Sequence, residues 1–121
     1  MTLILIVDDS PTELHQMQKA LEKHGYQTAV ASDGVEALSK ARELKPGLIF
    51  MDIVMPGMDG FRATRQLTSD PETRSIPVIV VSSKGEETDR IWAMRQGAVD
   101  YLVKPWSPEQ LVEKARAVLA G

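Results

Sequence analysis

Short apolar runs alternate along the chain with longer stretches in which apolar residues recur every three or four positions. A run of four or five apolar residues without alternation towards water is typical of a strand buried on both faces of a sheet. The longer stretches have the period of helices that pack on such a sheet. We expect strands at Leu3–Val7, about Gln27–Ala31, Leu48–Asp52, Val78–Val81 and Asp100–Val103.

The stretches between the strands carry helix start and stop signals. Ser10 and Ser107 are each followed by a proline at the first helical position and by Glu13 or Gln110 three residues after the cap, which is the pattern of a capping box. Glycines and a proline then interrupt the helical period. The expected helices run from Ser10 to Gly25, from Asp33 to Lys45, from about Phe61 to Leu67 or slightly beyond, from about Glu87 to Gln96, and from Ser107 to the end of the chain.

This strict alternation predicts an α/β fold with a doubly wound, five-stranded parallel sheet flanked by five helices. Right-handed crossovers between parallel strands place helices on both faces of such a sheet. Five strands fit the order 2-1-3-4-5, in which the first and third strands are neighbours. We therefore expect Asp8, Asp9 and Asp52, which end these two strands, to lie close together.

Length and composition limit the possibilities further. The 121 residues are enough for one domain, so we expect a single domain over residues 1–121 with no output domain, and a monomer. A net charge of −3 argues against nucleic acid as a partner. The absence of cysteine fits a reducing cytoplasm and excludes a thiolate metal site, and the first apolar run is too short to insert into a membrane.

The ends of the strands carry the candidate chemistry. Asp52 follows four apolar residues and precedes a Pro-Gly turn, which places it at the carboxyl end of a central strand, where open parallel sheets bind ligands. Standing alone, such an aspartate could simply cap the next loop. Three other strands also end in polar residues, namely Asp8 with Asp9, Ser82 with Ser83, and Lys104, and this repetition predicts a site.

Clustered carboxylates repel one another, and a divalent cation removes the conflict. A small set of oxygen ligands that leaves room for water and phosphate suits Mg²⁺. Zinc is disfavoured because the chain has no cysteine, and His15 and His24 are expected on the surface of a helix. Lys104 adds a cation opposite the metal, and the Ser82 hydroxyl can donate to a phosphoryl oxygen. The set predicts a phosphoaspartate formed on a carboxylate nucleophile.

The same residues carry a family resemblance over the whole chain. Together they resemble the receiver domain of two-component response regulators, which has the flavodoxin-like fold of CheY. The motifs that carry the resemblance are Asp8-Asp9, Asp52 followed by Met55-Pro56-Gly57-Met58-Asp59-Gly60, Ser82, Gly97-Ala98 and Lys104-Pro105. Serine instead of the more frequent threonine at position 82 is a mild departure, since it keeps the hydroxyl.

The resemblance implies a role for each site residue. Asp52 would accept phosphate from a CheA-like sensor histidine kinase, so that the protein catalyses only its own phosphorylation and dephosphorylation. Asp9 and Asp52 would ligate Mg²⁺ directly, Asp8 would act mainly through water, and the backbone carbonyl of Val54 would complete the protein ligands. The phosphoryl group would also contact Lys104.

Further implied features concern the response to phosphorylation. Ser82 and Tyr101 would be the switch pair, and the Lys104–Pro105 peptide bond would be cis. A phosphorylation-dependent protein partner would bind the face formed by the fourth helix, the fifth strand and the fifth helix, which includes Arg90, Met94, Tyr101 and Val103. For Met94 a core position is an equal alternative, and for Trp92 we expect burial rather than partner contact.

Val54 and Lys84 would flank the water that removes the phosphate. Neither side chain can orient that water as a base, so we expect slow to moderate loss of phosphate.

Finer features and competing interpretations remain. Four segments are similar to the stand-alone receivers of the PilH type in type IV pilus systems, which govern twitching motility: Asp9–Glu13, Ala63–Leu67, Glu87–Trp92 and Arg95–Ala98. Such a receiver either acts on a partner or serves as a phosphate sink for a shared kinase.

A haloacid dehalogenase-like phosphohydrolase shares this chemistry but places its nucleophile on the first strand and needs a substrate cap. A nucleotide-binding module would need a glycine-rich phosphate loop, which the first strand lacks.

Overall fold

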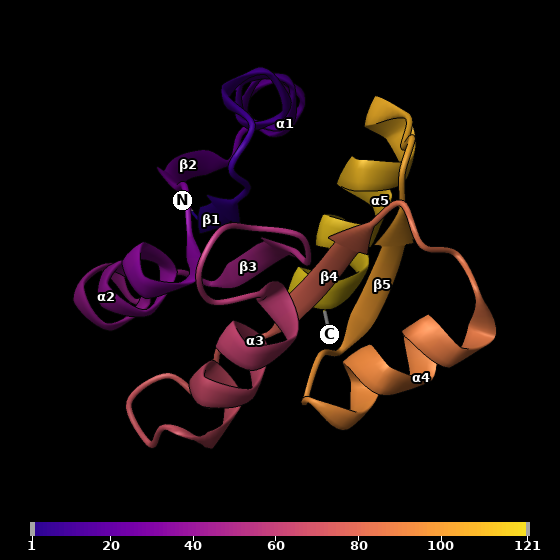
Figure 1. The fold of residues 1–121 in the computed structure, drawn as a ribbon. Helices are drawn as coiled ribbons and strands as arrows, with labels where there is room; N and C mark the ends of the chain where they lie inside the picture. The colour runs from indigo at the N-terminus through magenta and orange to yellow at the C-terminus, as the bar shows by residue number, and fades with distance from the viewer. Residues whose placement is uncertain (1, 121) are drawn as a thin grey trace.

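The computed structural model describes residues 2–120 and shows a five-stranded sheet between two layers of helices (Figure 1). All neighbouring strands are parallel, and their order is β2-β1-β3-β4-β5, as the sequence predicts. The elements are β1 (Leu3–Val7), α1 (Pro11–Lys23), β2 (Gln27–Ala31), α2 (Gly34–Leu44), β3 (Leu48–Asp52), α3 (Gly60–Ser69), β4 (Val78–Ser82), α4 (Glu87–Arg95), β5 (Asp100–Val103) and α5 (Pro108–Ala120).

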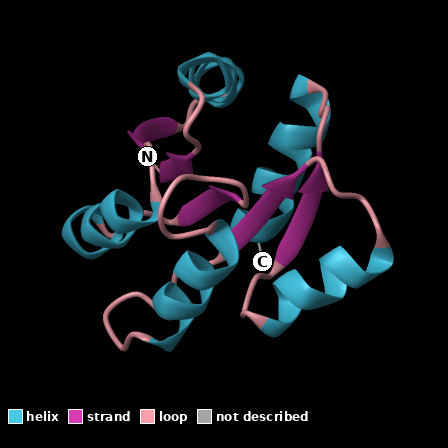
Figure 2. Cartoon of the chain, in the orientation of Figure 1, coloured by secondary structure: helices cyan, strands magenta, loops and turns pink. Residues whose placement is uncertain are grey.

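The two-residue period of the strands divides the core into two halves. In β1, Ile4 and Ile6 pack with α1 and α5, whereas Leu5 and Val7 pack with α2 and α3. A smaller cluster around Ala93 brings α4 against β4 and β5. Helices therefore cover both faces of the sheet (Figure 2), which is why β1, β3 and β4 carry apolar residues at nearly every position, whereas the edge strand β2 does not.

The central strand β3 is buried along its whole length and ends at Asp52. The chain then turns back so closely that α3 begins against the end of β3, where the Gly60 N–H donates to the Ile53 carbonyl oxygen at 2.9 Å. A Cβ atom at position 60 would overlap the Asp52 carbonyl oxygen, so only glycine fits there. This close approach fixes the loop that follows Asp52.

Helix caps agree with the sequence prediction except at one point. At Ser107 the capping box is complete, since Ser107 N–H donates to the Gln110 side chain and Gln110 N–H donates to Ser107 Oγ. At Ser10 only half of the predicted box forms: Glu13 N–H donates to Ser10 Oγ, but the Glu13 carboxylate binds Lys104 instead of returning to the cap.

No helix within residues 2–120 is long and apolar enough to cross a membrane.

Candidate functional site

Three carboxylates meet at the carboxyl edge of the sheet. One oxygen atom from each of Asp8, Asp9 and Asp52 lies within 4.8 Å of the other two. They converge because β1 and β3 are neighbours with Val7 paired to Met51, so that the residues following each strand emerge side by side. Asp8 and Asp52 are buried, whereas Asp9 is exposed. The predicted convergence of the three aspartates is confirmed.

Asp52 is the last residue of β3, and its carboxylate is nearly enclosed, with 8% of the side chain exposed. Its Oδ1 atom accepts a hydrogen bond from Lys104 Nζ at 3.0 Å. Burial raises the pKa of Asp52 above its ordinary value, although the Lys104 ammonium opposes this effect. The geometry therefore holds one carboxylate in a sheltered position with a cation beside it, as a nucleophile for phosphoryl transfer requires.

The surroundings of Asp8 disfavour the charged form of its carboxyl group. Burial, the neighbouring Glu13 carboxylate and the charge of Asp52 raise the pKa of Asp8 to about 7, against the opposing effects of the Ser10 N–H and Lys104. The Ser10 N–H donates to Asp8 Oδ1 at 2.9 Å, and Lys104 Nζ lies 3.3 Å from Asp8 Oδ2. A group of oxygen ligands with excess negative charge and one exposed member fits a divalent cation that keeps part of its water.

Lys104 connects the carboxylates. It follows β5 in the chain, and its Nζ atom donates to Asp8, Asp52 and Glu13. Burial by itself would lower the pKa of Lys104, but Glu13 and Asp52 raise it above its ordinary value. The ammonium is therefore fully charged at neutral pH. The Lys104–Pro105 peptide bond is cis, as the resemblance implies.

Ser82 and Tyr101 are joined through the backbone of Lys84. The Lys84 N–H donates to Ser82 Oγ at 3.1 Å, and the Tyr101 hydroxyl donates to the Lys84 carbonyl oxygen. Ser82 ends β4 at the same sheet edge as Asp52 and is buried. Burial raises the pKa of the Tyr101 phenol above its ordinary value. The loop after β4 is thus attached to both residues, an arrangement that side-chain patterns do not reveal.

The structure corrects two expectations about the partner face. Tyr101 is only 4% exposed, so its side chain is unavailable to a partner in this conformation. Trp92 is 48% exposed, and the predicted burial is wrong; its ring instead meets Phe61 edge to face, with centroids 6.4 Å apart. Met94 and Val103 are exposed large apolar residues, which excludes the core alternative for Met94.

The remaining predicted residues lie on the surface. Arg90 is exposed and forms an ion pair of 3.9 Å with Asp100. Val54 is 67% exposed in the loop after β3, and the Lys84 side chain is exposed beyond β4. His15 and His24 are exposed, as predicted.

Glu13 is the residue that the sequence interpretation missed. It was assigned to a helix cap, whereas its side chain reaches the cluster and accepts a hydrogen bond from Lys104. Burial alone would raise the pKa of Glu13, but its contacts with Asp8 and Lys104 hold it below its ordinary value. The available signal was its position in the first turn of a helix that begins directly behind Asp8 and Asp9, at the sheet edge where the site lies.

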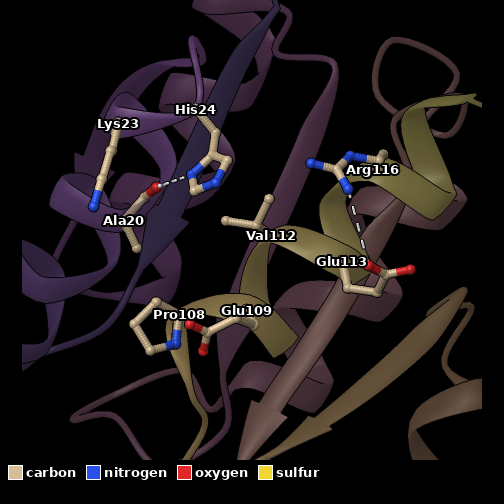
Figure 3. A pocket seen from close by; sticks show the side chains of 8 residues that line it. All are labelled: Ala20, Lys23, His24, Pro108, Glu109, Val112, Glu113 and Arg116. Carbon is tan, nitrogen blue, oxygen red and sulfur yellow. Dashed lines mark hydrogen bonds and ion pairs between the residues drawn. The ribbon is translucent and has the colours of Figure 1, made fainter.

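A separate groove of about 370 Å³ lies between α1 and α5 (Figure 3). Its charged side chains are partly satisfied by neighbours within the groove: Arg116 pairs with Glu113 at 4.0 Å, and the His24 ring is hydrogen-bonded to the Ala20 carbonyl oxygen. None of the three clustered aspartates lines this groove. The chemistry of the molecule is therefore concentrated at the carboxyl edge of the sheet, outside the groove.

Comparison with known proteins identifies the family. Residues 4–116 match the response regulator receiver domain. The chain belongs to this family. It is a receiver of two-component signalling, and receivers are signalling proteins rather than classical enzymes.

Relatives and solved structures agree with this assignment. This receiver is 55% identical over 121 residues to the protein PilH of Pseudomonas aeruginosa, with 100% of both chains covered. The chemotaxis protein CheY4 of Vibrio cholerae has a similar structure, with a TM-score of 0.93, 30% identity, and coverage of 98% of this chain and 99% of that one. The receiver domain of the sensor histidine kinase PA1611 of Pseudomonas aeruginosa, described with a magnesium ion coordinated in its active site cleft, has a TM-score of 0.91 at 28% identity and covers 99% of this chain and 98% of that one.

Proposed function

We propose that this receiver accepts a phosphoryl group on Asp52 from a histidine kinase and requires Mg²⁺ to do so. The observation that carries the proposal is the enclosed Asp52 carboxylate, which lies beside the other two aspartates and accepts a hydrogen bond from the Lys104 ammonium. The arrangement offers a nucleophile with positive charge available on both sides once a cation is bound. Such charge is what a transferring phosphoryl group needs.

Each residue then has a defined task. Asp9, Asp52 and the Val54 carbonyl oxygen would hold Mg²⁺, with Asp8 acting through water, and the ion would neutralise charge on the phosphoryl oxygens. An oxygen of Asp52 attacks the phosphorus of a phosphohistidine, the P–N bond breaks, and the imidazole leaves. Lys104 donates to a phosphoryl oxygen, and the Ser82 hydroxyl can donate its hydrogen to another while its Oγ accepts from the Lys84 N–H.

The direct test uses a small phosphodonor such as acetyl phosphate. With Mg²⁺ present, intact-mass spectrometry should show one phosphoryl group per chain, and chelation of the metal should prevent the addition. Failure to phosphorylate under both conditions would contradict the proposal. Phosphotransfer from candidate CheA-like kinases then identifies the physiological donor.

We further propose that the receiver works as a single domain in a type IV pilus chemosensory system that controls twitching motility. Support comes from the identity of 55% to PilH over its full length and from the resemblance in the surface helices. Two modes of action fit: a partner that recognises the phosphorylated surface, or a phosphate sink that competes for one kinase. Capture of a partner only by receiver treated with beryllofluoride, which mimics the phosphoryl group, distinguishes the first mode from the second.

The partner surface is expected at α4, β5 and α5. The triple variant Arg90→Ala, Met94→Ala and Val103→Ala should weaken binding of such a partner by about tenfold or more, because exposed apolar and arginine side chains dominate interfaces. Isothermal titration with the beryllofluoride-treated receiver measures the effect. A control that combines Val35→Ala and Glu43→Ala on α2 should bind normally. Equal affinities of the two variants would place the partner elsewhere.

The lifetime of the phosphorylated state is expected to depend on Val54 and Lys84. Val54→Asn adds a group that can hydrogen-bond the attacking water, and Lys84→Glu adds one that can orient it, so each should shorten the lifetime by about threefold to tenfold. Loss of phosphate after removal of the donor is followed by mass spectrometry. Val54→Ala is the control, since it opens space without adding a polar group. Wild-type decay rates in both test variants would exclude control by these positions.

A further inference from the structure

Glu13 binds the lysine of the site from helix α1, outside the strand ends that supply the other charged residues. It lies in the first turn of α1, and its side chain is 31% exposed, whereas the Lys104 side chain is 19% exposed. The two residues are 91 positions apart in the sequence. Their contact is therefore created by the tertiary fold, which packs the start of α1 against the loop after β5.

The ammonium group of Lys104 is shared among three carboxylates. Its Nζ atom lies 3.0 Å from Asp52 Oδ1 and 3.3 Å from Asp8 Oδ2, and it also donates to Glu13 Oε2. An ammonium has three N–H donors, so these contacts engage all of them. A new acceptor such as a phosphoryl oxygen must therefore displace one of the three carboxylates.

The three acceptors differ in what a metal would do to them. Asp8 and Asp52 belong to the group of oxygens within 4.8 Å of one another, together with Asp9, whereas Glu13 does not belong to it. A cation bound by the aspartates would neutralise Asp8 and Asp52 but leave the charge of Glu13 in place. Glu13 is then the carboxylate that retains Lys104 when the metal is bound.

We propose that Glu13 is a positioning residue for Lys104 both before and after phosphorylation. Before phosphorylation, it draws the Lys104 ammonium away from the metal-binding aspartates. After phosphorylation, it competes with the phosphoryl oxygens for the same ammonium. The inference rests on the proposed function and adds a residue that shifts the equilibria of Mg²⁺ binding and of phosphorylation. Glu13 thus favours binding of Mg²⁺ and limits the stability of the phosphorylated state. Removing its charge affects the two steps in opposite directions.

The test compares Glu13→Gln with wild type in two titrations. The affinity for Mg²⁺ alone, followed by tryptophan fluorescence, should fall by about threefold to tenfold, because one negative charge is lost and Lys104 settles on Asp8 and Asp52. At saturating Mg²⁺, the affinity for beryllofluoride should rise by about threefold to tenfold, because Lys104 is free to bind it. The ¹⁵N chemical shift of the Lys104 ammonium should also change in the variant without ligand.

The matched control is Glu109→Gln. Glu109 lies in the first turn of α5 and is exposed, so this variant removes the same charge from a helix start while leaving Lys104 untouched. Glutamine at position 13 keeps the N–H that binds Ser10 Oγ, and circular dichroism verifies that both variants fold. Opposite shifts of the two affinities in Glu13→Gln alone support the proposal. Shifts in the same direction, or values equal to those of Glu109→Gln, overturn it.

Wild type decides whether a failure concerns Glu13 or the whole site. If wild type binds Mg²⁺ and beryllofluoride while Glu13→Gln behaves identically, only the role of Glu13 is refuted. If wild type binds neither, the proposed function fails together with this inference.

Discussion

Replacing Asp52 with asparagine is expected to abolish phosphorylation. Asparagine has nearly the same shape, so the buried end of β3 should be preserved, but its amide is no nucleophile and loses the charge that attracts Lys104 and Mg²⁺. Phosphate incorporation from acetyl phosphate with Mg²⁺, measured by intact-mass spectrometry, should fall to background. This is the largest functional effect that we expect from a single substitution.

The control for this experiment is Asp59→Asn. Asp59 lies in the same loop and caps α3 by accepting the Arg62 N–H at 2.9 Å, and asparagine caps helices as well as aspartate does. Its phosphorylation should equal that of wild type. Undiminished incorporation by Asp52→Asn would mean that another residue is the acceptor, and mapping the modified peptide would locate it.

Replacing Asp8 with asparagine is expected to stabilise the protein in the absence of metal. The Asp8 carboxylate is buried beside two other carboxylates with one shared cation, and an amide removes its charge while its oxygen can still accept from the Ser10 N–H. We expect the free energy of unfolding to rise by roughly 2 kcal/mol at pH 7 or above. This is less than the full pKa shift of Asp8 corresponds to, because the lowered pKa of Glu13 has the opposite effect on stability. Urea denaturation in a chelating buffer measures the change.

The pH dependence of this gain follows from the sign of the shift. The pKa of Asp8 is about 7 in the folded protein and near 3.8 in the unfolded chain, so the folded state binds the proton more tightly. Between these values the folded state holds more protons, and its stability falls as the pH rises through this window. The advantage of Asp8→Asn should therefore be largest above pH 7 and disappear below about pH 4.

Asp9→Asn is the matched control, because Asp9 belongs to the same cluster but is exposed. It should leave the free energy of unfolding without metal nearly unchanged. Both substitutions should reduce the stabilisation that added Mg²⁺ provides to wild type. A metal-free Asp8→Asn protein that is less stable than wild type at pH 8 would contradict the view that the site is strained by buried like charge.

Much of the site could be predicted because its residues follow directly after strands. Asp8, Asp52, Ser82 and Lys104 stand at the ends of apolar runs, and parallel strands present those ends at one edge of the sheet. The neighbouring positions of β1 and β3 then bring the aspartates together. Local patterns sufficed here because the sheet itself converts sequence position into spatial position.

Prediction failed where the packing of several elements decides the outcome. Trp92 is large and apolar, yet α4 has only Ala93 buried, and the tryptophan lies beside Phe61 at the surface. Tyr101 is buried in the cluster around Ala93, and its hydroxyl donates to the Lys84 carbonyl oxygen. Neither result follows from the residue type or from the period of the element that carries it.

Sequence patterns alone predict the elements, their order along the chain and the edge of the sheet at which the charged residues gather. These properties depend on local hydrophobic period, on capping residues and on the geometry of parallel strands. Which charges are paired depends instead on how the folded elements pack against one another. Glu13 has the pattern of a helix cap, but the Ser10 N–H donates to Asp8, and the Glu13 carboxylate accepts from the partly buried Lys104 ammonium 91 residues away. A charge-assisted hydrogen bond in a sheltered site is stronger than one to an exposed cap.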